Sequence, residues 1–419
     1  MRLATLPGRA RLPVGRLLCA YGTIIAFNAC DGLSSSLVSP FLDAAGFLPT
    51  AIGALVAAQG VASLGSRLPA GALYHARRAR VLTWLALLAQ AGAVAAYPLA
   101  ADALQFGAAR VVAGLALGLG TTVNFALFTE LLPPTGAGRL RAVGVYLGCQ
   151  SAGYAIGNFL SGVAADALGY APAFWLAAAF PLLALPLPQT PPAPPAESGG
   201  AAPKSVVAMR PAPAWPARLR AYREPELGLM IALAFSMLFL YNLVNTFFPL
   251  FALGIGLSLS QVGVFRGLQS LANAITRPFT GELARQLGYR RMGHLGLAAS
   301  VALTAALPWF QLFEVYVGVF LLLGLTRGAA LVSNSLSAVE LVERRGLPRG
   351  IVAGLLNAAQ DGGNIAGPVV GGLVVASLGV GTTLHLLPLA MGVLYLVAVV
   401  GVALGGAGAA CADEAESRA

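Results

Sequence analysis

The stretch that decides the fold is 81–100, VLTWLALLAQAGAVAAYPLA, in which apolar side chains cover every face. A helix that crosses the hydrocarbon core of a bilayer needs about 20 predominantly apolar residues, and this segment supplies them. A membrane-spanning barrel strand would instead alternate apolar and polar residues over about ten positions. Because lipid offers no hydrogen-bond partners, the backbone N–H and C=O groups must bond to each other within the segment. The stretch therefore predicts a transmembrane α-helix.

Similar apolar runs recur along the chain. Of its 419 residues, 58% are hydrophobic and 10% are charged, whereas a soluble domain carries about 25% charged residues. The runs predict an all-α membrane protein with twelve spans, at 17–41, 49–74, 81–100, 103–132, 140–166, 170–188, 226–251, 258–284, 293–311, 313–343, 350–377 and 383–408.

The net charge of +10 has a topological explanation. Basic residues occupy the N-terminal segment and every second connection, for example Arg77, Arg78 and Arg80, whereas the alternate connections contain no Lys or Arg and carry acids such as Asp43 and Glu314. Short cytoplasmic loops of membrane proteins hold the excess of Lys and Arg. We therefore expect a multi-pass protein of the bacterial inner membrane, with both termini in the cytoplasm and no nucleic-acid partner.

The chain is interpreted as two copies of one six-helix unit. A gap-free offset of 210 residues aligns identical residues of the two halves, among them Gln59 with Gln269, Arg67 with Arg277, Arg80 with Arg290, Glu130 with Glu340 and Arg139 with Arg349. Self-similarity at one fixed spacing indicates duplication. The predicted parts are a six-helix bundle (1–188), a Pro/Ala-rich cytoplasmic linker (189–225), a second six-helix bundle (226–408) and a cytoplasmic tail (409–419).

Two copies with an even number of helices have the same orientation in the membrane. They are then related by a pseudo-twofold axis along the membrane normal, and a solute pathway is expected at their interface.

Four segments resemble three motifs of the major facilitator superfamily. The connections that begin at Gly71 and Gly281 resemble that family's G-x-L-x-D-x-x-G-x-R-R loop, with His75 and Arg285 in place of the Asp. Arg110 and the glycines after it resemble the R-x-x-x-G motif of the fourth helix, and 363–372 (GNIAGPVVGG) resembles the antiporter pattern G-x-x-x-G-P-x-x-G-G. The resemblance covers nearly the whole chain and is closest to bacterial drug:proton antiporter-type efflux proteins.

The charged residues that fall inside apolar spans include Asp31, Arg110, Arg266, Arg327 and Asp361. A charge at the bilayer centre costs about 3 kcal/mol on insertion scales, so each should face a cavity and have a partner. One interpretation is a set of salt bridges that only hold the bundle together. The other is a functional site, in which a carboxylate carries a proton and the arginines bind an anionic or zwitterionic solute through charge-assisted hydrogen bonds.

The resemblance suggests roles for two of these charges. In the drug:proton antiporters, an acidic residue of the first helix and the Arg of the fourth helix serve in proton coupling, so we expect Asp31 to bind the coupling proton and Arg110 to pair with it. Burial favours the neutral carboxyl and a nearby Arg favours the anion, so a moving Arg would switch the proton affinity of the carboxyl.

The remaining candidates fall into three groups. The expected substrate-binding set consists of Arg266, Arg327 and Asp361 together with seven polar side chains: Asn28, Asn124, Gln150, Tyr154, Asn242, Asn334 and Gln360. The alternative role for these seven is interhelical hydrogen bonding. Two salt-bridge clusters are expected to close an inner gate: Arg67, Arg80, Glu130 and Arg139, and their repeats Arg277, Arg290, Glu340 and Arg349. Small residues that allow close packing or hinge bending are Gly363, Gly367, Pro368, Gly371 and Gly372.

A secondary active transporter fits these features better than an enzyme does. The three histidines are scattered, and no H-E-x-x-H motif or phosphate-binding loop occurs. We therefore expect a proton gradient to supply the driving force, and we expect no cofactor or metal. We expect a monomer in the bilayer that moves a small organic solute by proton-coupled efflux. The alternative is proton-coupled uptake of an anionic or zwitterionic metabolite.

Overall fold

The computed structural model describes residues 14–132, 137–187 and 224–418, and these ranges contain twelve α-helices. The first six are α1 (Val14–Ala44), α2 (Pro49–Leu73), α3 (Ala79–Ala96), α4 (Ala103–Glu130), α5 (Ala137–Leu168) and α6 (Tyr170–Ala184). The second six are α8 (Pro225–Gly254), α9 (Leu259–Leu287), α10 (Tyr289–Ala306), α11 (Phe313–Arg345), α12 (Arg349–Leu378) and α13 (Val380–Arg418). Each predicted span coincides with one helix.

The offset of 210 residues recurs in the secondary structure. The helices α2, α3, α4 and α6 begin 210 residues before α9, α10, α11 and α13, respectively. The short 3-10 turns Tyr97–Leu99 and Leu307–Trp309 obey the same offset, and so do the positive-φ glycines Gly46 and Gly256. The duplication read from the residues is therefore present in the backbone.

Eight helices are long and apolar enough to cross a membrane by length and composition alone, and α6 is a shorter apolar helix. The other three described helices are α5, α9 and α12, which pack on the opposite half of the molecule. Polar residues toward the centre of the protein lower their mean hydropathy, because a helix buried between two bundles does not need an apolar surface on every side.

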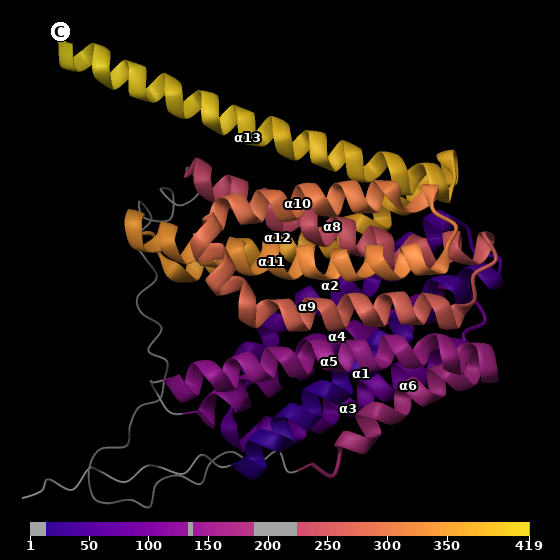
Figure 1. Ribbon diagram of the computed structural model, residues 1–419. Helices are drawn as coiled ribbons and strands as arrows, with labels where there is room; N and C mark the ends of the chain where they lie inside the picture. Colours follow the sequence, from indigo (N-terminus) through magenta and orange to yellow (C-terminus); the bar gives the residue numbers. More distant parts are fainter. Residues whose placement is uncertain (1–13, 133–136, 188–223, 419) are drawn as a thin grey trace, which may run out of the picture.

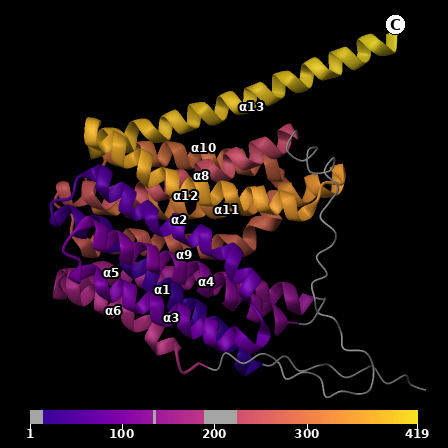
Figure 2. The same ribbon diagram turned by 180° about the vertical axis from the view of Figure 1, so that it is seen from behind.

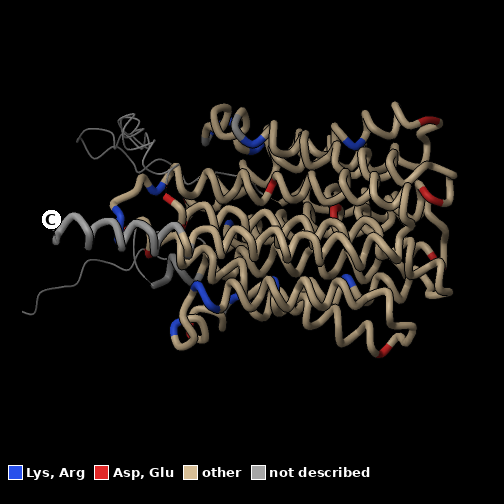
Figure 3. The backbone as a smooth tube through the Cα atoms, turned by 90° about the horizontal axis from the view of Figure 1, so that it is seen from above, with Lys and Arg blue, Asp and Glu red and all other residues tan. Residues whose placement is uncertain are grey.

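The two six-helix bundles lie side by side, with the second half above the first in Figure 1 and in the reverse view of Figure 2. Contacts between the halves run mainly through α5 with α9 and α2 with α12. The loops with Asp43, Asp102 and Glu314 form one end of the molecule, which we call the acidic end. The loops with arginines, such as those at 77–80 and 344–349, form the arginine-rich end, and Figure 3 shows this separation of charge.

The halves touch at the acidic end and separate toward the arginine-rich end. A Cβ atom added to Gly162 of α5 would clash with the backbone of Leu259 in α9, and one on Gly372 of α12 would meet the carbonyl oxygen of Pro49. Among the described residues, a Cβ on Gly144 or Gly350, near the other ends of α5 and α12, would have no neighbour within 4 Å. The structure is therefore closed at its acidic end.

Two parts of the predicted domain division need comment. The predicted linker lies mostly outside the described residues, which resume at Glu224. The predicted tail (409–419) is helical as far as the structure describes it, since α13 continues to Arg418.

Candidate functional site

A polar cavity of about 360 Å³ lies between the halves. Its lining residues follow helical spacing on single faces, because positions three or four apart project from the same side of a helix. Such rows are Asp31, Ser35 and Ser39 of α1, Gln59, Ser63 and Arg67 of α2, and Arg266, Ser270, Asn273 and Arg277 of α9. Cavities that bind small ligands have volumes of about 300–1,000 Å³, so this one has room for a small solute.

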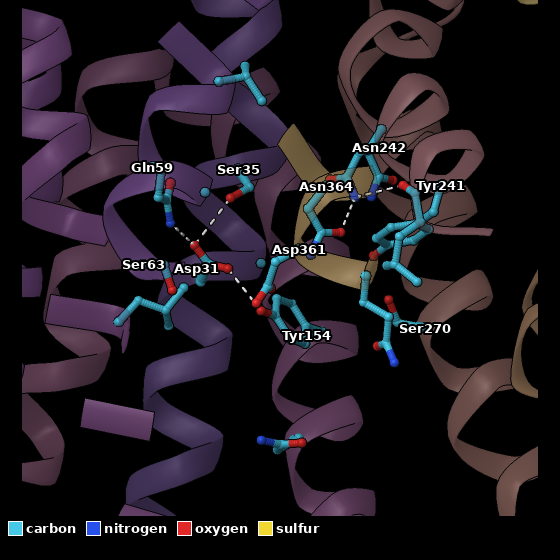
Figure 4. A pocket seen from close by; sticks show the side chains of 18 of the residues that line it. Asp31, Ser35, Gln59, Ser63, Tyr154, Tyr241, Asn242, Ser270, Asp361 and Asn364 are labelled. Atoms are coloured by element: carbon cyan, nitrogen blue, oxygen red, sulfur yellow. Dashed lines mark hydrogen bonds between the residues drawn. The ribbon is translucent and has the colours of Figure 1, made fainter. Parts of the chain in front are cut away.

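Asp31 is held by three hydrogen-bond donors (Figure 4). The Nε2 atom of Gln59 donates to Oδ1 of Asp31 over 2.6 Å, and the Ser35 hydroxyl donates to the same oxygen over 3.3 Å. The hydroxyl of Tyr154 donates to Oδ2 over 3.0 Å. Asp31 is 7% exposed and lines the cavity. The Asp31 carboxylate therefore accepts hydrogen bonds from neutral groups of its own half, and it lies where a solute in the cavity would contact it.

The predicted ion pair between Asp31 and Arg110 is wrong for this conformation: it is not among the salt bridges of the described residues. Arg110 also lines the cavity, but its Nε and Nη2 atoms donate to the carbonyl oxygens of Leu55 and Val56 in α2, over 3.2 and 3.1 Å. Its guanidinium also lies 5.9 Å from the centre of the Tyr97 ring. Two carbonyl oxygens and an aromatic face satisfy most of the bonding capacity of the Arg110 guanidinium. The position beside Asp31 is taken instead by the side-chain amide of Gln59 in α2.

Positive charge gathers on the second-half side of the cavity, where Arg266, Arg277 and Arg327 lie. The Arg327 guanidinium stacks on Tyr241, 3.4 Å from the ring centre. Arg266 is 5% exposed and donates from Nη1 to the carbonyl oxygen of Ser35 in the other half, over 3.3 Å. The Nε atoms of Arg266 and Arg327 have no hydrogen-bond partner within the described part of the chain. Both donors are therefore buried and unpaired, on residues that line the cavity.

An ion pair joins the halves at the edge of the cavity. The Nη1 atom of Arg67 in α2 lies 3.0 and 2.8 Å from the two carboxylate oxygens of Asp361 in α12. The side chain of Asp361 is 11% exposed and that of Arg67 is 46% exposed, so the carboxylate is the more shielded partner. Beside this pair, Asn242 of α8 donates to Asn364 of α12 over 2.6 Å.

Seven members of the expected substrate-binding set line the cavity: Arg266, Arg327, Asp361, Gln150, Tyr154, Asn242 and Gln360. Three do not, and their prediction is corrected. Asn28 donates to the carbonyl oxygen of Ile24, Asn124 accepts from the Tyr146 hydroxyl, and Asn334 donates to the carbonyl oxygen of Met230. These amides are used in packing within one half, which was the alternative role considered for them.

The two expected gate clusters are not assembled in this conformation. Arg67 pairs with Asp361 and Arg277 lines the cavity, while Arg80 stacks on Trp84 at 4.4 Å. Arg290 pairs with Glu226 and Arg349 with Glu343, both at 3.5 Å, whereas Glu130 and Glu340 are exposed. The side chain of Arg139 lies outside the described residues. Three of these arginines, Arg67, Arg290 and Arg349, thus pair with acids other than Glu130 and Glu340.

The small residues of α12 lie at two contacts. Cβ atoms on Gly363, Gly367 and Gly371 would meet α8 at Phe235, Phe239 and Phe247. Gly372 faces Pro49 of the other half, and the carbonyl oxygen of Pro368 faces Gly53 there. The expected packing positions therefore lie at close helix contacts, and two of them contribute to the closed acidic end.

Sequence reasoning missed several cavity residues, namely Ser35, Ser39, Gln59, Ser63, Ser270 and Asn273. Each lies three, four or eight residues from a charged candidate on the same helix, for example Ser270 after Arg266. A search for polar positions at helical spacing from every intramembrane charge would have found them.

Comparison with known proteins identifies the family. The Major Facilitator Superfamily model matches residues 20–353, and the chain therefore belongs to that superfamily and is a multi-pass membrane protein of a transporter family. No match was found among curated proteins.

Solved structures of the same fold are similar over nearly the whole chain. One is a bacterial homologue of the human lysosomal transporter Spinster, inward-facing and occupied, with a TM-score of 0.72 and 15% identity, covering 95% of this chain and 98% of that one. Its unoccupied form has a TM-score of 0.70, 15% identity and coverages of 94% and 96%. The nucleoside transporter NupG has a TM-score of 0.72, 12% identity and coverages of 93% and 98%.

Proposed function

We propose that this chain is a secondary active transporter that moves a small organic anion or zwitterion by alternating access, together with a proton carried by Asp31. The observation that carries the proposal is the charge of the cavity. Five arginines line it (Arg67, Arg110, Arg266, Arg277 and Arg327), against the two carboxylates of Asp31 and Asp361. The excess of three positive charges, with unpartnered guanidinium N–H groups, favours a solute that brings negative charge.

The charge balance also favours symport over the efflux by antiport that the sequence motifs suggested. A proton on Asp31 removes a negative charge from the cavity and so strengthens the binding of an anion. A unit charge about 8 Å away in a medium of effective dielectric constant about 20 contributes about 2 kcal/mol, or about thirtyfold in affinity. Such coupling is reciprocal, so the anion also strengthens proton binding and the two are carried together. Antiport requires the opposite, namely competition between proton and solute.

The orientation follows from the charged loops. Arginine-rich loops remain cytoplasmic under the positive-inside rule, so the open end of the cavity faces the cytoplasm and the acidic end faces outward. On this ground we propose that both termini lie in the cytoplasm and that the membrane is a bacterial inner membrane. With an inwardly directed proton gradient, symport then results in uptake.

The test is proton flux in proteoliposomes that contain a pH-sensitive dye. Organic anions, zwitterions and cationic drugs are added outside, one at a time, under a small imposed pH gradient. We expect anions or zwitterions to carry protons inward with them. Asp31→Asn should abolish this proton movement while solute binding persists, and Asp43→Asn, on the same helix at the acidic end, should leave it unchanged.

Two results would redirect the proposal. Proton movement opposite to the solute, elicited by cationic drugs, would restore the efflux antiporter. Unaltered proton-coupled flux in the Asp31→Asn protein would remove Asp31 from the mechanism.

A further inference from the structure

A second cavity of about 370 Å³ runs between α11 and α12. Its walls are apolar and include Ala338, Val342, Val352 and Leu356, and Val339 at its edge is 54% exposed. It extends along α12 from Arg349 to Gln360, which is about 16 Å at 1.5 Å per helical residue. The groove is thus long and apolar, with polar side chains at both ends.

The matching region of the first half is filled differently. At the matching positions of the first half, 210 residues earlier, α4 and α5 are joined by aromatic rings. Phe128 stacks on Tyr146 with ring centres 4.5 Å apart, and Phe125 lies 5.4 Å from Tyr146. The second half has Ser335, Ala338 and Leu356 in place of Phe125, Phe128 and Tyr146. Loss of three rings removes the filling between the helices and leaves the groove.

The groove adjoins the central cavity. Asn357 and Gln360 line both of them. A molecule bound beside these two amides would have the positively charged cavity on one side of them and the apolar wall of α11 and α12 on the other. The far end of the groove has the charged residues Glu343 and Arg349, near the arginine-rich end of the protein.

We propose that the groove binds the alkyl tail of an amphiphilic anion whose head group occupies the central cavity. This inference rests on the proposed function and narrows its substrate class. The excess of arginines suits the anionic head, and the apolar walls suit a flexible chain that would otherwise remain in water. The polar amides at the junction lie where head and tail meet.

The test is binding of straight-chain alkylsulfonates to the protein in lipid nanodiscs, with empty nanodiscs subtracted. Sulfonates keep their charge at all working pH values, and ethane-, butane-, hexane- and octanesulfonate are used below micelle-forming concentrations. Each methylene that leaves water should tighten binding by about fourfold. If only three are covered, octanesulfonate binds about sixtyfold more tightly than ethanesulfonate.

The variant Ser335→Phe restores the ring of the first half at the groove edge, and the double variant with Ala338→Phe fills the groove. We expect stepwise loss of the chain-length dependence, with ethanesulfonate affinity unchanged. Leu325→Phe adds a ring to α11 outside both cavities and should alter neither. Leu325 is 41% exposed, so the ring should not disturb packing.

Three results would overturn the inference. They are equal affinities for ethane- and octanesulfonate, no binding of octanesulfonate, and a chain-length dependence that survives both phenylalanine variants. The first leaves the anion site of the proposed function intact. The proposed function is tested by a separate measurement, and it is refuted if short anions drive no proton movement in proteoliposomes.

Discussion

The contact that closes the acidic end offers a sharp test of alternating access. The carboxylate of Asp166, at the end of α5, accepts a hydrogen bond of 2.7 Å from the backbone N–H of Ser260 in the other half. Ser260 is the second residue of α9, so this N–H has no partner inside its own helix. The bond joins a negative charge of one half to the positive helix end of the other, and it must break when the acidic end opens.

The substitution Asp166→Ala should therefore shift the protein toward the state that is open at this end. Removing a carboxylate from a helix N-terminus costs about 1 to 2 kcal/mol in comparable cases, which corresponds to about five- to thirtyfold in the equilibrium. If the open state holds about 1% of the molecules, a common population for a minor state, it rises to about 5–25%. Such a change is measurable as a distance distribution.

The assay is electron–electron double resonance between two spin labels at the acidic end. Leu104 of α4 and Leu312 before α11 are suitable positions, because both are exposed, at 82% and 64%, and they belong to different halves. They are changed to cysteine in a chain whose four native cysteines are replaced by alanine. The Asp166→Ala protein should show a larger long-distance fraction than its parent.

Asp43→Ala is the matched control, since Asp43 is also an acid at this end of the first half. Among the described residues, it makes no hydrogen bond or ion pair with the second half. An unchanged distance distribution in the Asp166→Ala protein, or the same shift in both variants, would refute the reasoning that this bond holds the end closed.

Two further predictions concern contacts between the halves. Gly162→Val should push α5 away from α9 and increase the same long-distance fraction, because the new side chain meets the Leu259 backbone. The control Gly144→Val faces open space and should leave that fraction unchanged. Equal behaviour of the two variants would contradict the close approach of α5 and α9. For the bridge between Arg67 and Asp361, a double-mutant cycle with Arg67→Gln and Asp361→Asn should give a coupling of about 1 kcal/mol in the free energy of unfolding, above that of most exposed pairs because the carboxylate is shielded. A coupling below about 0.3 kcal/mol would show that the pair adds nothing to stability.

Much of the site could be anticipated from single residues. Charges in apolar spans are costly, so Asp31, Arg110, Arg266, Arg327 and Asp361 had to face a cavity, and all five do. What they bind there could not be anticipated in the same way. The reach of each side chain depends on the distance and rotation of its neighbouring helices, which no local pattern records.

The amino-acid sequence by itself determined the helices, their number, the duplication and the division of charge between the two ends. The helices follow from local hydrophobicity, because an unpaired backbone group is costly in lipid, and the duplication follows from one repeated spacing. Only the tertiary structure decided the partners. Arg67 meets Asp361 across 294 positions of sequence, and Arg110 bonds to backbone carbonyls that carry no side-chain signal. Such contacts arise from the packing of two bundles, in which a rotation of one helix exchanges one neighbour for another.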